Sequence, residues 1–111
     1  MISPDDFRRL ALSMPQAIER SHMGTVDFRC GRIFATLGNP DAAWAMVKLT
    51  PDQQEMRVAA EPDVFVPVAG GWGKGGATRL RLAACDEATA RGALLDAWRN
   101  VAPKALVGAQ P

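Results

Sequence analysis

The chain has 111 residues, of which 48% are hydrophobic and 23% are charged. This length and composition suit a single globular domain over residues 1–111, and they exclude a disordered chain. Thirteen basic and twelve acidic residues leave a net charge of +1, without the large basic excess typical of strong nucleic-acid binders. Any charged site must therefore arise from local clustering.

We expect a cytoplasmic protein without a membrane partner, because the sequence has no long apolar run and its first residues predict a helix rather than a secretion signal. We also expect a monomer. Cys30 and Cys85 are too few and too far apart for a disulfide framework. With His22 they match no metal-ligand spacing, so we expect neither a metal nor a cofactor.

The first element is a helix that begins after Ser3, a favourable N-cap, with Pro4 at the first helical position. Its apolar stripe at helical spacing is Phe7, Leu10, Ala11 and Met14. Pro15 ends it.

Four strands are expected next, because apolar and polar residues alternate between turn signals. They span Ile18 to Met23, Val26 to Cys30, Arg32 to Leu37 and Ala43 to Leu49. The last places Trp44, Met46 and Lys48 on one face, and Trp44 is expected in the core.

Thr50 and Gln53 form a capping box, which predicts a short helix ending before Pro62. Two strands follow, Val64 to Val68 and Ala77 to Ala83, and Pro67 places the first of them at an edge or an end. A long helix runs from Asp86 to about Asn100 with Trp98 on its apolar stripe, and Lys104 to Pro111 adds a helical turn. Helices flanking runs of strands indicate an α+β fold, with helices on one face of an antiparallel sheet.

Half of the ten glycines lie in the segment 70–76, around Trp72 and Lys74. Its dinucleotide-like glycine spacing precedes a strand instead of opening a helix, so it predicts no dinucleotide site. Two interpretations remain open. One is a flexible hairpin between strands, and the other is a projecting wing in which Trp72 stacks or wedges and Lys74 meets phosphate.

Arg79 and Arg81 share one face of the following strand. They form either a solvated sheet face or, with Lys74, a basic surface to which Arg29 and Arg32 contribute from neighbouring strands.

Other polar residues predict no catalytic centre. His22 is interpreted as a strand residue without a special task, and Glu19 and Asp27 are the only carboxylate pair worth inspecting.

The ordered series of residues resembles the MmcQ/YjbR family of small bacterial proteins. The likeness runs through Phe28 to Ala35, Trp44 to Leu49, Trp72-Gly73-Lys74, Arg79 to Leu82 and Ala97 to Arg99 with Ala102-Pro103-Lys104. It implies a frataxin-like α+β fold and binding of double-stranded DNA through a double wing. The wings would be the segment 70–76 and the turn at Gly31 and Arg32.

The leading hypothesis is thus a non-catalytic DNA-binding protein whose candidate residues are Arg29, Arg32, Trp72, Lys74, Arg79 and Arg81. The alternative is a protein- or small-ligand-binding adaptor in which Trp72 closes over a groove on the sheet. An enzyme is the least favoured, because no paired catalytic groups are visible.

Overall fold

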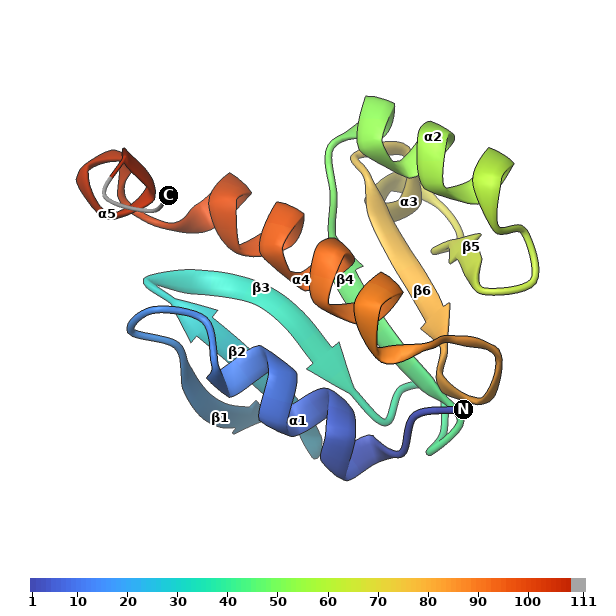
Figure 1. Cartoon of the computed structure of the whole chain (residues 1–111), viewed down its shortest axis with the longest axis horizontal. Helices are drawn as coiled ribbons and strands as arrows, with labels where there is room; N and C mark the ends of the chain where they lie inside the picture. The colour runs from blue at the N-terminus through green and yellow to red at the C-terminus, as the bar shows by residue number, and fades with distance from the viewer. Residues whose placement is uncertain (109–111) are drawn as a thin grey trace.

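The computed structural model describes residues 1–108, which form a six-stranded antiparallel sheet and its helices (Figure 1). The helices are α1 (Pro4–Leu12), α2 (Pro51–Ala60), α3 (Gly71–Lys74), α4 (Glu87–Val101) and α5 (Lys104–Gly108), with a 3-10 turn at Leu82–Ala84. The strands are β1 (Ile18–His22), β2 (Thr25–Cys30), β3 (Arg32–Leu37), β4 (Trp44–Lys48), β5 (Phe65–Pro67) and β6 (Ala77–Arg81). The α+β class is confirmed.

The sheet has the order β1-β2-β3-β4-β6-β5, so the first four strands form the expected meander. β6 then pairs with β4, and β5 forms the far edge. The predicted edge position of Pro67 is confirmed. β1 forms the other edge, and all five of its residues are exposed.

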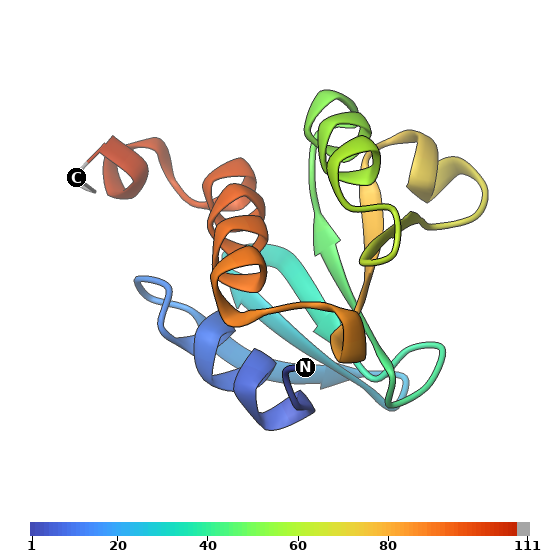
Figure 2. The same ribbon diagram turned by 45° about the vertical axis from the view of Figure 1, so that its right-hand side comes forward.

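The terminal helices α1 and α4 cover one face of the sheet, as expected (Figure 1). α2 covers β5 and β6, and α3 lies on the opposite side of β6 (Figure 2). The caps follow the sequence signals, because the Ser3 and Thr50 side chains accept hydrogen bonds from the backbone three residues on. None of the helices in residues 1–108 has the length and apolarity that crossing a bilayer requires.

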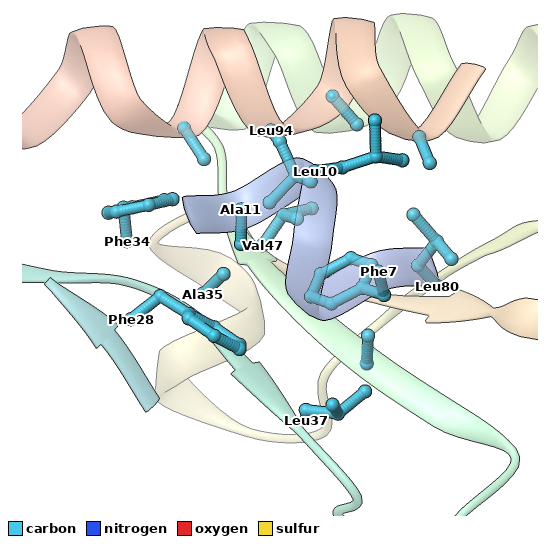
Figure 3. Packing of buried hydrophobic residues seen from close by; sticks show 14 of the residues in the cluster. Phe7, Leu10, Ala11, Phe28, Phe34, Ala35, Leu37, Val47, Leu80 and Leu94 are labelled. Carbon is cyan, nitrogen blue, oxygen red and sulfur yellow. The ribbon is translucent and has the colours of Figure 1, made fainter. Parts of the chain in front are cut away.

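The core lies between these helices and the sheet (Figure 3). Phe7 of α1 meets Phe28 of β2 edge to face, with ring centroids 6.1 Å apart. Trp98 of α4 has no exposed surface, and its indole N–H donates to the Pro15 carbonyl oxygen at 3.0 Å. That hydrogen bond ties α4 to the segment after α1, so the predicted core position of Trp98 is confirmed.

The glycine-rich segment differs most from expectation, because residues 71–74 form a helical turn within the β5–β6 connection. β6 also ends at Arg81, where the chain turns into the 3-10 helix instead of continuing to Ala83. The predicted last helical turn is α5, and residues 109–111 of that prediction lie outside the described residues.

Candidate nucleic-acid interface on the open face of the sheet

The strand register assigns each side chain to one of two faces of the sheet. One continuous row crosses from β1 to β6 through Arg20, Asp27, Thr36, Met46 and Arg79. Opposite residues in an antiparallel pair point to the same side, and neighbours along a strand point to opposite sides. This row is therefore on the face away from α1 and α4, which we call the open face.

A second open-face pair is Trp44 and Arg81, which lie opposite each other on β4 and β6. The Arg81 guanidinium carbon is 4.3 Å from the centre of the Trp44 ring, within cation–π range. Trp44 is thus half-buried beneath an arginine and is not part of the core. The expected core position was wrong, although the alternation of β4 residues between two faces was predicted correctly.

The open face carries five strand-borne cations and a single strand-borne carboxylate, Asp27. The cations are Arg20, Arg29, Lys48, Arg79 and Arg81, placed there by register. Among the described residues, only Arg29 of these five has a carboxylate within 4.0 Å. The other strand carboxylate, Glu19, is bound by Arg8 of α1 at 2.9 Å and is on the helix-covered side. The strand side chains of the open face therefore carry a net positive charge, although the whole chain is nearly neutral.

Asp27 is fully buried and binds two neighbours on the open face. Its carboxylate accepts from Arg29 Nε at 2.8 Å and Nη2 at 3.2 Å, and it is 2.6 Å from His22 Nδ1. The Arg29 guanidinium, helped by the His22 ring, holds the pKa of Asp27 below its ordinary value although burial acts to raise it. Asp27 is therefore an anion at neutral pH that neutralises Arg29.

The glycines of the segment 70–76 permit close backbone packing. A Cβ atom on Gly73 would lie 1.6 Å from the Val68 carbonyl oxygen. One on Gly76, whose φ is +112°, would lie 2.0 Å from the Leu49 carbonyl oxygen. The Gln54 side chain of α2 adds a hydrogen bond to the Gly73 carbonyl oxygen at 2.9 Å. These contacts pack α3 against the sheet, so the segment is a packed helical turn and not the hairpin of the first of the two interpretations.

Trp72 projects from α3 over the open face and remains 74% exposed. On one side it borders a hollow of about 120 Å³ together with Met46 and Arg79. On its other side it borders a hollow of about 190 Å³ together with Lys48 and Ala77. The indole therefore stands between two depressions in the positive surface.

The structure brings together four of the six residues expected to contact DNA. Trp72 and Lys74 belong to α3, and Arg79 and Arg81 lie on β6 beside it. Arg29 is on the same face but is neutralised by Asp27. Arg32 is exposed and paired in register with Cys30, a buried core residue, so it is not on the open face.

Sequence reasoning missed three open-face residues, namely Arg20, His22 and Lys48. The two carboxylates that the sequence singled out for inspection, Glu19 and Asp27, lie on opposite faces of the sheet. Across the β1–β2 pair, Asp27 contacts the His22 ring instead. The available signal was the tight turn at Gly24, which pairs His22 with Thr25 and so places it diagonally next to Asp27. Arg20 becomes identifiable by the same register.

Comparison with known proteins agrees with this architecture. The YjbR family model matches residues 12–100, most of the chain. The chain belongs to the YjbR family. It is also similar to the crystal structure of a Deinococcus radiodurans protein with a DUF419 domain, with a TM-score of 0.78 and 19% sequence identity. That likeness covers 95% of this chain and 82% of the other, and at this identity it shows the fold alone. A search of curated proteins gave no match.

Proposed function

We propose that this YjbR-family protein is a non-catalytic DNA-binding protein that contacts duplex DNA with the open face of its sheet. The observation that carries the proposal is the segregation of charge. Arg20, Lys48, Arg79 and Arg81 all project from that face, and none has a carboxylate partner among residues 1–108. Unpaired cations on one surface attract the phosphate backbone and release its counterions.

The position of α3 supports the same surface. Lys74 ends α3, and Trp72 lies above the strands that carry the arginines. A fixed, exposed indole beside arginines is suited to wedge into a groove or stack on a base. In this arrangement α3, held by its packed glycines, serves as a wing of the interface, and the turn at Gly31 and Arg32 takes no part.

The test compares two variants that remove the same number of charges. Lys74→Gln/Arg79→Gln/Arg81→Gln removes three cations from the proposed surface and leaves Arg20 and Lys48 in place. Its matched control, Arg32→Gln/Arg99→Gln/Lys104→Gln, removes three exposed cations from elsewhere. Fluorescence anisotropy with a labelled random-sequence duplex would give the dissociation constant over a range of salt concentrations.

We expect the log–log salt slope of the first variant to fall by about 0.9 for each phosphate that the protein no longer neutralises. The control should keep nearly the slope of the unmodified protein. Equal reductions in both variants would mean that binding follows net charge alone, and the open face would not be the interface. Absence of any salt-dependent duplex binding by the unmodified protein would overturn the proposed function itself.

A further inference from the structure

The hollow beside Trp72 is a built cavity on the open face. It measures about 120 Å³, and six of its lining residues are His22, Thr36, Asn39, Met46, Trp72 and Arg79. They come from β1, β3, the β3–β4 turn, β4, α3 and β6. Pockets for drug-sized ligands measure about 300–1,000 Å³, so this hollow suits a single ring system.

The apolar walls favour a flat ligand. The Trp72 indole is 74% exposed, whereas Met46, which lines the same hollow, is only 8% exposed. A planar ring placed against the indole would cover apolar surface on both residues. Aromatic pairs with offset or edge-to-face geometry contribute beyond the area they bury, about 0.5–1.5 kcal/mol.

The polar groups offer both hydrogen-bond donors and acceptors at the edge of such a ring. Thr36 is only 8% exposed and lines the hollow, where its hydroxyl can donate one hydrogen bond and accept another. Asn39 supplies an amide, which carries a donor and an acceptor side by side. A heterocycle with mixed ring-edge groups satisfies this set better than a hydrocarbon ring does.

His22 is held in one orientation by the buried carboxylate beneath it. Its Nδ1 is 2.6 Å from Asp27 Oδ2, and because Asp27 is anionic, Nδ1 carries the proton and donates. Nε2 is then the ring nitrogen left for a ligand. Arg29 donates a hydrogen bond to the other oxygen of the Asp27 carboxylate and so helps to hold that carboxylate in place beneath His22.

Arg79 supplies the charge at the hollow. It is half-buried, lines the cavity, and has no carboxylate within 4.0 Å among the described residues. A guanidinium in this state is a bidentate partner for phosphate oxygens.

We propose that this hollow binds a single nucleotide, with the base against Trp72, the base edge toward Thr36, Asn39 and His22, and the phosphate on Arg79. The same chemistry has two sources, a free mononucleotide or an unpaired nucleotide at the end of a DNA strand. The inference goes beyond duplex binding and does not depend on it.

The test is a titration of the full chain, labelled with nitrogen-15, with nucleoside 5′-monophosphates, followed by NMR. The indole N–H signal of Trp72 is assigned by its disappearance in Trp72→Phe. The variants are Arg79→Gln and Thr36→Val, and the matched control is Arg32→Gln, an exposed arginine outside the open face and outside the lining of the hollow.

We expect saturable shifts of the Trp72 signal, with affinity about tenfold weaker or more in Arg79→Gln, since that variant cannot form the hydrogen bond to a charged group. The Arg32→Gln variant should bind within about twofold of the unmodified protein. A nucleoside without phosphate should bind equally to the unmodified protein and to Arg79→Gln. Thr36→Val should discriminate among the four bases differently from the unmodified chain.

A second arm separates the two sources. A duplex with a single-stranded 3′ overhang is compared with a blunt duplex of equal length, again through the Trp72 signal. Overhang-specific shifts without mononucleotide binding would assign the site to strand ends, and mononucleotide binding without an overhang effect would assign it to free nucleotides. If neither probe moves the signal, or inorganic phosphate alone reproduces every shift, the nucleotide site is refuted, even where blunt duplex binding persists.

Discussion

The two faces of the sheet use the same strands for opposite purposes. On the helix-covered face, Phe28, Val47 and Leu80 have no exposed surface and pack under α1 and α4. On the open face, the side chains one residue away along the same strands are Asp27, Met46 and Arg79. Because neighbouring side chains along a strand point to opposite faces, the same three strands supply both the core and the charged surface.

Stability and recognition can therefore be altered separately in this chain. Large apolar side chains on the helix side are expected to determine the free energy of unfolding. The unpaired cations on the open side are expected to contribute little to it, because exposed charges gain little on folding. Asp27 is the exception, since it is an open-face residue that is fully buried.

The sharpest contrast is between two tryptophans. Trp98→Ala should lower the free energy of unfolding by about 3–5 kcal/mol, because it empties a fully buried site and breaks the bond to the Pro15 carbonyl. Trp72→Ala should change it by only about 0.5 kcal/mol, because that side chain is 74% exposed. Urea unfolding monitored by circular dichroism measures both. Similar destabilisation of the two variants would contradict the separation of the faces.

Asp27→Asn should come next, destabilising the fold by about 1.5–3 kcal/mol at pH 7, because Arg29 and His22 are left without a charged partner. The folded pKa of Asp27 is below its unfolded value of 3.8, so its stabilisation is complete above that value. It is lost as the pH falls toward the folded pKa. The stability difference between Asp27→Asn and the unmodified protein should therefore shrink between pH 7 and pH 3. A difference that stays constant with pH would show that the charge of Asp27 does not stabilise the fold.

The third destabilising change concerns the support of Trp72. Gly73→Ala should cost about 1–3 kcal/mol, because its Cβ would meet the Val68 carbonyl oxygen at 1.6 Å. Gly71→Ala, in the same helical turn, meets no atom within 4 Å and is the matched control. It should be neutral or slightly stabilising, because alanine favours a helix over glycine. Thermal unfolding of both variants tests whether α3 is held by packing, and equal melting temperatures would contradict that packing.

Most of the fold was predictable because local signals agreed with the tertiary structure. The caps at Ser3 and Thr50, the alternation through β4 and the proline in β5 each gave the right element. The α3 turn was not predictable, since four residues with two glycines have no helical propensity. It forms because Gly73 and Gly76 fit against carbonyl groups that are near only in the folded chain.

The candidate site was predictable in part for the same reason. Arg79 and Arg81 follow from alternation along a single strand, so their shared face could be read directly. The pairing of Arg29 with Asp27, also two residues apart on one strand, could have been read in the same way, whereas the fixing of His22 depends on how β1 and β2 are registered. Alternation within one strand does not contain that information. The β-bulge near Phe28 and Arg29 shifts the pairing again, and it places Arg32 beside Cys30.

The edges of the sheet determine which kinds of partner can attach to the protein. β5 is a strand of three residues that includes Pro67, which lacks an N–H donor. At the opposite edge, β1 carries the charges of Glu19 and Arg20. Edge strands that are short, contain proline or carry charges disfavour the addition of a strand from another polypeptide, either in fibril growth or in the binding of an extended peptide. A partner of this protein is therefore selected by side chains and not by main-chain pairing.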